Sequence, residues 1–192
     1  MEVLLGLLTV EPMSGYDLKQ AIQNSTRHFW NESYGQIYPN LKRMAAAGLV
    51  RAKIEKSKGK PDRRVYSITG KGRERLAAWL AVPPQPEIPR NELLLKLFFG
   101  AQSAPETLIG FLERMAESER MVLSRFAEVA KEIEKNRQYP DAPYWRMTLR
   151  FGQFELEAHQ RWAEESLVEL RRLARKRRGT PASGKEKPHA SM

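Results

Sequence analysis

The chain of 192 residues has no cysteine and only three histidines. Without cysteine there are no disulfide bonds and no thiolate chemistry, which fits a protein of the reducing cytoplasm. The histidines are scattered, at His28, His159 and His189. Two of them have a glutamate four residues away, Glu32 and Glu155, but one such pair supplies too few ligands for a metal ion. We therefore expect no metal site.

Sequence signatures of enzymes and of membrane proteins are also missing. The chain has no glycine-rich phosphate loop, no nucleophile elbow and no serine with a recognisable base. It has no apolar run of the roughly 18 residues that cross a bilayer, and its apolar N-terminus lacks the basic flank and cleavage site of a signal peptide. We expect a cytoplasmic protein that is not an enzyme, needs no cofactor and does not bind a membrane.

The charge is distributed unevenly along the chain. The formal net charge is +10. Residues 1–82 carry 14 Lys and Arg against 7 Asp and Glu, residues 83–170 carry 11 against 15, and residues 171–192 carry 8 against 1. A basic first segment followed by an acidic second one predicts that double-stranded DNA is the partner of the first.

Residues 33–69 combine a helical pattern with a hairpin pattern, which is typical of a winged helix. The helix has an apolar face and an outward polar face, made respectively of Ile37, Leu41, Met44 and Leu49, and of Gln36, Asn40, Lys42 and Arg43. Gly48 is the expected C-cap and Ser33 the expected start. Pro39 leaves two alternatives open: the helix begins close to Tyr38, or an early turn lacks one hydrogen bond.

The hairpin that follows has a connecting turn made almost entirely of Lys, Gly, Pro and Asp. Alternation predicts one face toward the core and one toward water, with Val50, Ala52, Ile54, Tyr66 and Ile68 inward and Arg51, Lys53, Glu55, Val65 and Ser67 outward. Cations crowd the tip, at Lys56, Lys58, Lys60, Arg63 and Arg64. Such a tip is either a solvated turn or a contact for DNA phosphates, and the neighbouring polar helix face favours the second.

The rest of residues 1–82 completes one small core. Residues 1–10 predict a core helix, Ser14 the N-cap of a second helix, and Thr69 the N-cap of a last helix that ends before Pro83. The fold class predicted is mainly α: an N-terminal winged helix-turn-helix with a two-stranded β wing, and a C-terminal dimerisation domain of long helices. About 80 residues suffice for the first core.

Three stretches of this first part, MSGYDLKQAI, YGQIYPNLKRMAAAGLV and GKPDRRVYSITGKGRERL, resemble the PadR family of bacterial transcriptional regulators. The resemblance depends on the order and spacing of Gly15-Tyr16, Gln36-Ile37-Tyr38-Pro39, Leu41, Gly48-Leu49, Arg64-Val65-Tyr66 and Thr69. The remainder is similar, in helical layout and length, to the subfamily with a large helical C-terminal domain. The resemblance implies a repressor that dimerises through its C-terminal helices.

The polar helix face and the wing supply the candidate DNA-binding residues. Because amide side chains pair bidentately with adenine, the candidates for base edges are Gln36, Tyr38 and Asn40. The candidates for flanking phosphate or base contacts are Tyr34, Lys42 and Arg43. The wing residues expected on phosphates are Lys58, Lys60, Arg63 and Arg64. The preceding helix adds Tyr16 and Lys19.

Residues 83–89 contain four prolines and predict a stiff linker between two domains. Beyond it, helices are predicted over 90–99, 104–136 and 144–178. The first long helix carries the apolar stripe Leu108, Phe111, Leu112, Met115, Val122, Phe126, Val129 and Ile133. The second carries Trp145, Leu149, Phe154, Trp162, Leu167 and Leu170.

Helices this long leave one side of their apolar stripes bare in a single copy. A second copy is the expected cover, so residues 90–178 are predicted to form a homodimer. Two winged helices related by a two-fold axis match a palindromic operator. The tail, residues 179–192, has little to bury and is predicted to be disordered; it is either a solubilising end or an additional nonspecific DNA arm.

A small-molecule effector is a further possible partner. Aromatic and methionine residues of the last helix suggest a pocket made of Tyr144, Trp145, Met147, Phe151, Phe154 and Trp162, although an apolar stripe is more often plain core. The function predicted is therefore a PadR-like homodimeric repressor that a ligand or signal releases from its operator. The alternatives are a winged-helix protein-interaction module and an activator without a small-molecule effector.

Overall fold

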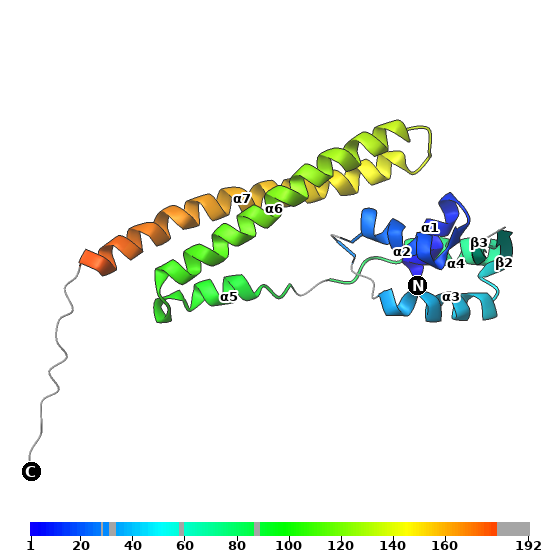
Figure 1. The fold of residues 1–192 in the computed structure, drawn as a ribbon, viewed down its shortest axis with the longest axis horizontal. Helices are drawn as coiled ribbons and strands as arrows, with labels where there is room; N and C mark the ends of the chain where they lie inside the picture. Colours follow the sequence, from blue (N-terminus) through cyan, green and yellow to red (C-terminus); the bar gives the residue numbers. More distant parts are fainter. Residues whose placement is uncertain (28, 31–33, 58–59, 87–88, 180–192) are drawn as a thin grey trace, which may run out of the picture. The chain divides into compact units, whose positions relative to one another are not determined.

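The chain folds into helices and one small antiparallel sheet (Figure 1). This computed structural model describes residues 1–27, 29–30, 34–57, 60–86 and 89–179. It divides into two units, residues 1–87 and residues 88–192. The mainly helical class with an N-terminal winged helix is confirmed. Among the described residues, every helix is either too short or too polar to cross a bilayer.

In its described residues, the N-terminal unit contains four α-helices and three strands. The helices are α1 (Glu2–Val10), α2 (Gly15–Asn24), α3 (Ile37–Ala46) and α4 (Gly70–Leu80), with a 3-10 turn over Tyr34–Gln36. The strands are β1 (Met13–Ser14), β2 (Val50–Ser57) and β3 (Lys60–Ile68), in the order β1-β3-β2. Strand β1 was not predicted, because two residues are too few to show an alternating pattern.

Side-chain caps begin two of these helices, as predicted. The Oγ of Ser14 accepts a hydrogen bond from the backbone N–H of Asp17, whose carboxylate accepts one from the backbone N–H of Ser14, which completes a capping box. The Oγ1 of Thr69 accepts a hydrogen bond from the N–H of Gly72 at 3.1 Å. These bonds satisfy N–H groups that the first helical turns leave unpaired.

One continuous core holds the N-terminal unit together. Its members come from every helix up to α3 and from the sheet: Leu4, Leu5, Leu8, Met13, Leu18, Ile22, Ile37, Leu41, Met44, Leu49, Val50 and Tyr66. Ile68 and Leu76 pack against its edge. Because these side chains are buried within one copy, the unit needs no partner to remove its main apolar surface from water.

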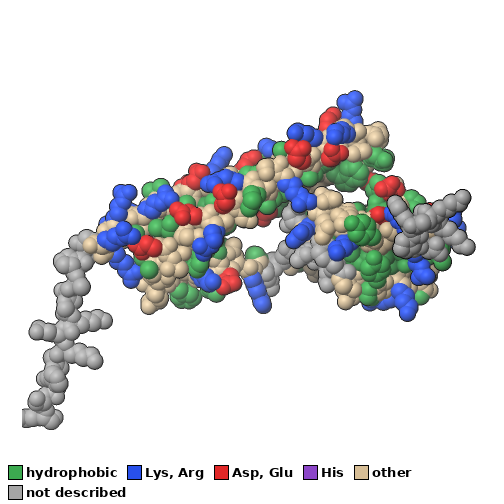
Figure 2. Space-filling view, viewed as in Figure 1, with side chains coloured by type: hydrophobic (Ala, Val, Ile, Leu, Met, Phe, Trp, Pro, Cys, Tyr) green, Lys and Arg blue, Asp and Glu red, His purple; other side chains and the backbone are tan. Residues whose placement is uncertain are grey.

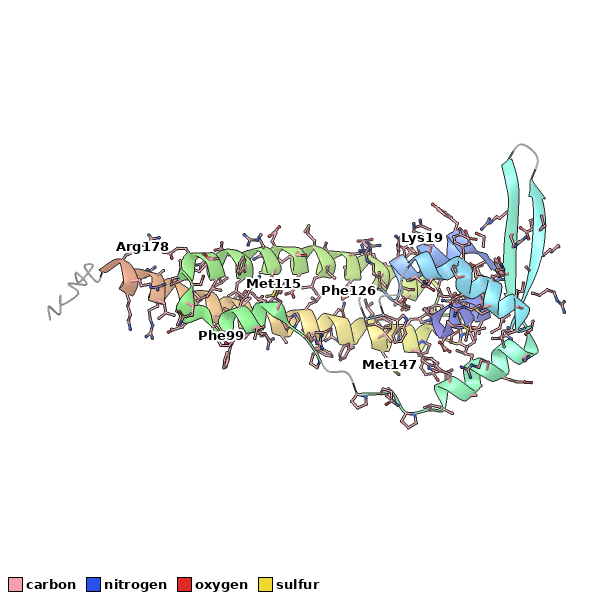
Figure 3. The ribbon with its side chains drawn as sticks, turned by 90° about the horizontal axis from the view of Figure 1, so that it is seen from below. Lys19, Phe99, Met115, Phe126, Met147 and Arg178 are labelled. Atoms are coloured by element: carbon pink, nitrogen blue, oxygen red, sulfur yellow. The ribbon has the colours of Figure 1, made fainter. Side chains whose placement is uncertain are left out.

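The predicted alternation in the hairpin is only partly correct. Val50 and Tyr66 are buried as expected. Ala52 and Ile54, expected to face inward, are exposed because the hairpin extends past the helices that it covers (Figure 3). Val65, expected to face water, is buried because β3 is the central strand and places it between Ser14 of β1 and Lys53 of β2.

The C-terminal unit is a long helical hairpin with a short helix before it. Its helices are α5 (Glu92–Phe98), α6 (Pro105–Lys135) and α7 (Ala142–Gly179), which confirms the three predicted helices to within a few residues. Helices α6 and α7 lie side by side and antiparallel along most of their length (Figures 1 and 3). Acidic and basic side chains are interspersed along their exposed surface (Figure 2).

Two apolar clusters fill the seam between α6 and α7. One contains Leu108, Leu112, Leu167 and Leu170, and the other Phe126, Ile133, Ala142 and Leu149. Figure 3 shows Met115 and Phe126 between the two helices. The buried residues of α7 are Ala142, Leu149, Ala163, Leu167, Leu170 and Ala174, which are separated by intervals of 7, 14, 4, 3 and 4 positions and so keep a seven-residue repeat. This spacing is typical of antiparallel coiled-coil packing.

Phe154 is a wrong member of the predicted inner stripe. It is exposed, because it lies five residues after the buried Leu149 and therefore about 140° around the helix from it. The seam instead passes through Gly152, where an added Cβ would lie 2.9 Å from the ring of Phe126. A glycine at this position lets α7 approach α6 closely.

Candidate nucleic-acid interface

Helix α3 ends in a well-formed Schellman motif. Gly48 has a φ of +70°, a left-handed conformation that glycine adopts without strain. Its N–H donates to the carbonyl of Ala45 at 3.0 Å, and the N–H of Leu49 donates to that of Met44 at 2.9 Å. At the other end, Pro39 is the third residue of the helix, where its missing N–H costs no intrahelical bond. The expected start, Ser33, lies outside the described residues.

Two further side chains from outside α3 bind the carbonyl groups at its C-terminal end. The ammonium of Lys71 donates to the carbonyl oxygen of Ala47 at 3.0 Å. The hydroxyl of Thr69 donates to the carbonyl oxygen of Gly48 at 2.7 Å. The role of Lys71 was missed, because the two partners lie 24 residues apart and no local pattern joins them. The start of α4 thus holds the end of α3 in place.

The outward face of α3 presents most of the predicted residues to solvent. Gln36, Tyr38, Lys42 and Arg43 are exposed. Of Tyr34 only the backbone is described. The ring of Tyr38, 62% exposed, lies over the start of α2: a Cβ added to Gly15 would be 2.5 Å from its Cε1 atom. Tyr38 is therefore positioned by a glycine of the neighbouring helix.

The prediction that Asn40 faces outward is wrong. Its exposed fraction is 5%. It lies three residues after Ile37 and four before Met44, both buried, and so belongs to the inner face of the helix. Its Oδ1 accepts a hydrogen bond from Nη2 of Arg43 at 2.6 Å. Asn40 orients the Arg43 guanidinium from within the protein, and the helix spacing alone was sufficient to show its burial.

Helix α2 brings its predicted residues close to α3. Tyr16 is 63% exposed and Lys19 is half-buried; Figure 3 labels Lys19 on this helix. Tyr16 follows Gly15 directly, so it lies next to the contact between Gly15 and Tyr38. Helices α2 and α3 contact each other, as the two helices of a helix-turn-helix do.

Of the four cations predicted in the wing, two have described side chains, and these two differ in their contacts. Lys58 lies outside the described residues, and only the backbone of Lys60 is described. The side chains of Arg63 and Arg64 are both exposed on β3. Nη2 of Arg63 donates to Oδ2 of Asp17, whereas for Arg64 no ion pair is found within the described part of the chain. The pair between Arg63 and Asp17 was not predicted, because 46 residues separate its members.

Three donors converge on the Asp17 carboxylate. Its Oδ2 accepts from the Ser14 N–H at 2.9 Å, from the Ser14 hydroxyl at 2.8 Å and from Arg63. Partial burial by itself would raise the pKa of Asp17, but the Ser14 hydrogen bonds and the Arg63 guanidinium outweigh it, so the pKa lies below the ordinary value of 3.8.

The predicted effector residues do not all lie together. Met147, Phe151 and Phe154 line an open groove of about 520 Å³ on α7, with Pro143, Arg146 and Arg150. The guanidinium of Arg150 lies 4.0 Å from the centre of the Phe154 ring. Tyr144 is exposed but does not line this groove. Trp145 and Trp162 pack in the α6–α7 seam, which removes them from any pocket on this face.

Histidine and acidic residues form no metal centre in the part of the chain that the structure describes. His28, Glu32 and His189 lie outside this part. His159 does not pair with Glu155; its Nδ1 lies 2.9 Å from Oε1 of Glu119, across the seam. The pair separates the two apolar clusters of the hairpin.

Comparisons with known proteins match both units. Residues 4–78 match the transcriptional regulator PadR-like family, and residues 89–171 match the family described as virulence activator alpha C-term. The negative transcriptional regulator PadR of Bacillus subtilis is 32% identical over 97 residues, which are 50% of this chain and 53% of that protein. The chain spans about half the length of the curated relatives it matches.

Solved structures share the fold over nearly the whole chain. The Vibrio cholerae virulence activator AphA has a TM-score of 0.71 at 28% identity, covering 90% of this chain and 98% of that one. B. subtilis PadR in complex with operator DNA has a TM-score of 0.77 at 23% identity, covering 88% and 96%. The same PadR has also been solved in complex with p-coumaric acid, with a TM-score of 0.69 at 23% identity, covering 88% and 96%.

The four helices, the three-stranded sheet and the extended hairpin define a winged helix-turn-helix protein with a helical C-terminal unit. The match of residues 4–78 makes the N-terminal unit similar to the transcriptional regulator PadR-like family.

Proposed function

We propose that this chain is a DNA-binding transcriptional regulator whose DNA-binding surface is the exposed face of α3 together with the wing. The observation that carries the proposal is that Gln36, just before α3, and Tyr38 and Lys42, on α3, are exposed within residues 1–82, whose net charge is +7. In helix-turn-helix proteins the second helix enters the major groove, while flanking residues bind phosphates. Helix α3 is the second helix of this pair.

The contacts divide by chemistry. The amide of Gln36 and the ring of Tyr38 are suited to base edges, and Lys42 and Arg43 to phosphates at the groove margin. Tyr16 and Lys19 border this surface on α2. Asn40 is buried beneath this surface and orients Arg43, because its Oδ1 accepts a hydrogen bond from the Arg43 guanidinium.

We also propose a homodimer, which the surface of the C-terminal unit supports. Large apolar side chains lie on the face of α7 turned away from α6, at Tyr144, Met147, Phe151 and Phe154. Another group lies on and just after α5, at Leu94, Leu95, Phe98 and Phe99. Contiguous apolar patches of this kind mark protein interfaces. We assign the α7 face to a second copy, which would present two winged helices to a palindromic operator.

The direction of regulation is proposed from the relatives. The B. subtilis relative is a negative regulator, and we propose repression for this chain. The alternative is activation, which is favoured by the match of residues 89–171 and by the likeness to AphA. Repression and activation can be distinguished with a reporter gene placed behind a DNA site that the chain binds. Loss of the regulator should raise expression of the reporter if the chain is a repressor and lower it if the chain is an activator.

A small apolar effector is proposed to act through the α7 face. The groove of Met147, Phe151 and Phe154 offers aromatic surface beside Arg146 and Arg150. The groove lies in the face assigned to the second copy. A ligand bound there would therefore change how the two copies pack against each other, and hence the distance between their two winged helices. A ligand that releases the operator without changing this pairing would contradict the assignment.

The central test is selection of bound duplexes from a random pool with the full-length chain. Replacing Gln36 by Ala should weaken binding to the selected site by about 1–3 kcal/mol and relax the preference at one base pair. The same change at Gln102, an exposed glutamine of the C-terminal unit, is the matched control and should leave binding unchanged. Unaltered discrimination in the Gln36 variant would remove α3 from base recognition.

A further inference from the structure

The outer half of the wing lacks the support that the sheet gives its base. Among the residues that the structure describes, strand β1 pairs with β3 only at Tyr66 and Val65. Before Val65, the described part of β3 pairs with β2 alone, as in the pair Glu55 with Arg63. A two-stranded ribbon twists more strongly than a wider sheet and is only marginally stable by itself. The direction of the ribbon therefore depends on whatever ties it to the helices.

Arg63 supplies such a tie at the point where β1 ends. It lies two residues before Val65 and so projects from the same face of β3. Its Nη2 donates to Oδ2 of Asp17, the third residue of α2. That same oxygen is held by the backbone N–H and the hydroxyl of Ser14. The carboxylate is thus fixed in the capping box, and the arginine joins the ribbon to α2.

The connection continues from α2 to the α3 surface. Helix α2 contacts α3, and its first residue, Gly15, lies against the ring of Tyr38. The ribbon, the start of α2 and Tyr38 are therefore linked through neighbouring residues. Because the carboxylate and the guanidinium neutralise each other, the pair adds little net attraction for phosphates.

We propose that Arg63 and Asp17 are positioning residues, which set the direction of the wing relative to α2 and α3 and thereby the phosphates that the wing reaches. This rests on the proposed function, since it concerns DNA binding by the same surface. It assigns Arg63 a role different from that of Arg64, for which no ion pair is found among the described residues. Arg64 is the direct phosphate ligand of the two.

The variant Asp17→Asn distinguishes the two roles by the sign of its effect. If Arg63 positions the wing, removing the carboxylate charge loosens the ribbon and weakens operator binding, about tenfold for the loss of one charge-assisted contact. If Arg63 is itself a phosphate ligand, the same change removes a negative charge beside the DNA and tightens binding. A tighter complex would overturn the proposal.

Two adjacent arginines give a matched comparison of salt dependence. Arg64→Gln should reduce the slope of log binding constant against log salt concentration by about one unit, on specific and random DNA alike. Arg63→Gln should weaken operator binding about tenfold while the slope stays unchanged, because a positioning arginine contacts no phosphate and so releases no counterion from the DNA. Equal slopes for the two variants, both reduced, would show that Arg63 binds phosphate.

Two controls separate positioning from folding. Leu8→Ala removes a core side chain of α1 that has no part in the wing or in its tie to α2, so it should lower stability and leave the affinity of the folded protein unchanged. The double variant Asp17→Asn with Arg63→Gln should bind no more weakly than Arg63→Gln alone, since both remove one interaction. Additive losses, or an equal loss in Leu8→Ala, would overturn the proposal. Failure of the unmodified chain to bind any selected duplex would instead overturn the proposed function and this inference with it.

Discussion

The two units bury their apolar residues in different ways. In the N-terminal unit, seven side chains of one continuous core are less than 2% exposed: Leu4, Leu5, Leu18, Ile22, Ile37, Leu41 and Met44. Among the described residues of the C-terminal unit, Leu112 is the one large side chain at that level, beside the small Ala142 and Ala163, and the apolar residues form two clusters along a single seam. The core of the first unit is enclosed on several sides by helices and the sheet, whereas the apolar residues of the second unit are buried mainly between two helices.

The exposed apolar residues show the same difference. Phe98, Phe151 and Val168 of the C-terminal unit are exposed by more than 60%. Apart from Leu80 at the end of α4, the most exposed large side chains of the N-terminal unit are tyrosines, Tyr16 and Tyr38, which have a polar end and lie on the proposed DNA surface. A two-helix hairpin has too little interior to bury all its apolar residues, and the proposed homodimer rests on this difference from the winged helix.

The largest effect is expected from separating the units. A fragment of residues 1–82 should stay folded and monomeric, and bind the full operator about 10²–10⁴-fold more weakly than the intact chain, because it loses the effective concentration that linkage gives the second head. Sedimentation and DNA titration of the fragment check this. If the fragment dimerises and binds as tightly as the intact chain, the division of labour between the units is wrong.

A charge placed on the α7 face should break the homodimer. Phe151→Asp removes a large side chain whose burial is worth about 1.5–3 kcal/mol in each copy and adds an ion to the interface. The intact chain should then sediment as a monomer at micromolar concentration. The control is Ser124→Asp, an exposed position of α6, which should leave the dimer unchanged. Dimers that persist in the Phe151 variant would place the interface elsewhere.

Two glycines of the N-terminal unit should respond to alanine with opposite signs. A Cβ on Gly72 would lie 2.2 Å from the carbonyl oxygen of Leu49, so Gly72→Ala should lower the free energy of unfolding by about 1–3 kcal/mol. On Gly6, inside α1, a Cβ meets nothing within 4 Å, so Gly6→Ala should raise it by about 0.5–1 kcal/mol. Denaturant unfolding of the fragment 1–82 measures both, and effects of one sign would contradict this account.

The smallest expected effect is the dependence of folding stability on acidic pH, through the Asp17 carboxylate. Because the pKa of Asp17 is lower in the folded chain than its ordinary value of 3.8, the ionised carboxylate stabilises the fold above that pH, and this contribution is lost as the pH falls below it. The stability difference between the unmodified chain and Asp17→Asn should therefore be constant near neutral pH and shrink on acidification. Thermal unfolding at several pH values tests the trend, and a difference that grows in acid would reverse the assigned sign.

Much of the N-terminal unit was predictable, and so were the three C-terminal helices. Ser14, Gly48 and Thr69 act within a few residues of their own position, so their capping roles follow from local sequence. The Asn40 error was a misjudged helix face and not a limit of the sequence. The predicted effector residues are divided between two faces of α7 for another reason: an apolar stripe does not state which face meets α6, so Trp145 and Phe154 appeared equivalent until their burial was known.

The sequence by itself determined the basic winged helix, the proline-rich segment after α4 and the amphipathic long helices, because charge, caps and apolar periodicity are properties of neighbouring residues. Only the tertiary structure decided which distant groups meet. Arg63 with Asp17, Lys71 with Ala47, and His159 with Glu119 are 46, 24 and 40 residues apart. Such contacts depend on how strands and helices pack in space, and packing is a collective result of many side chains that no short pattern in the sequence contains.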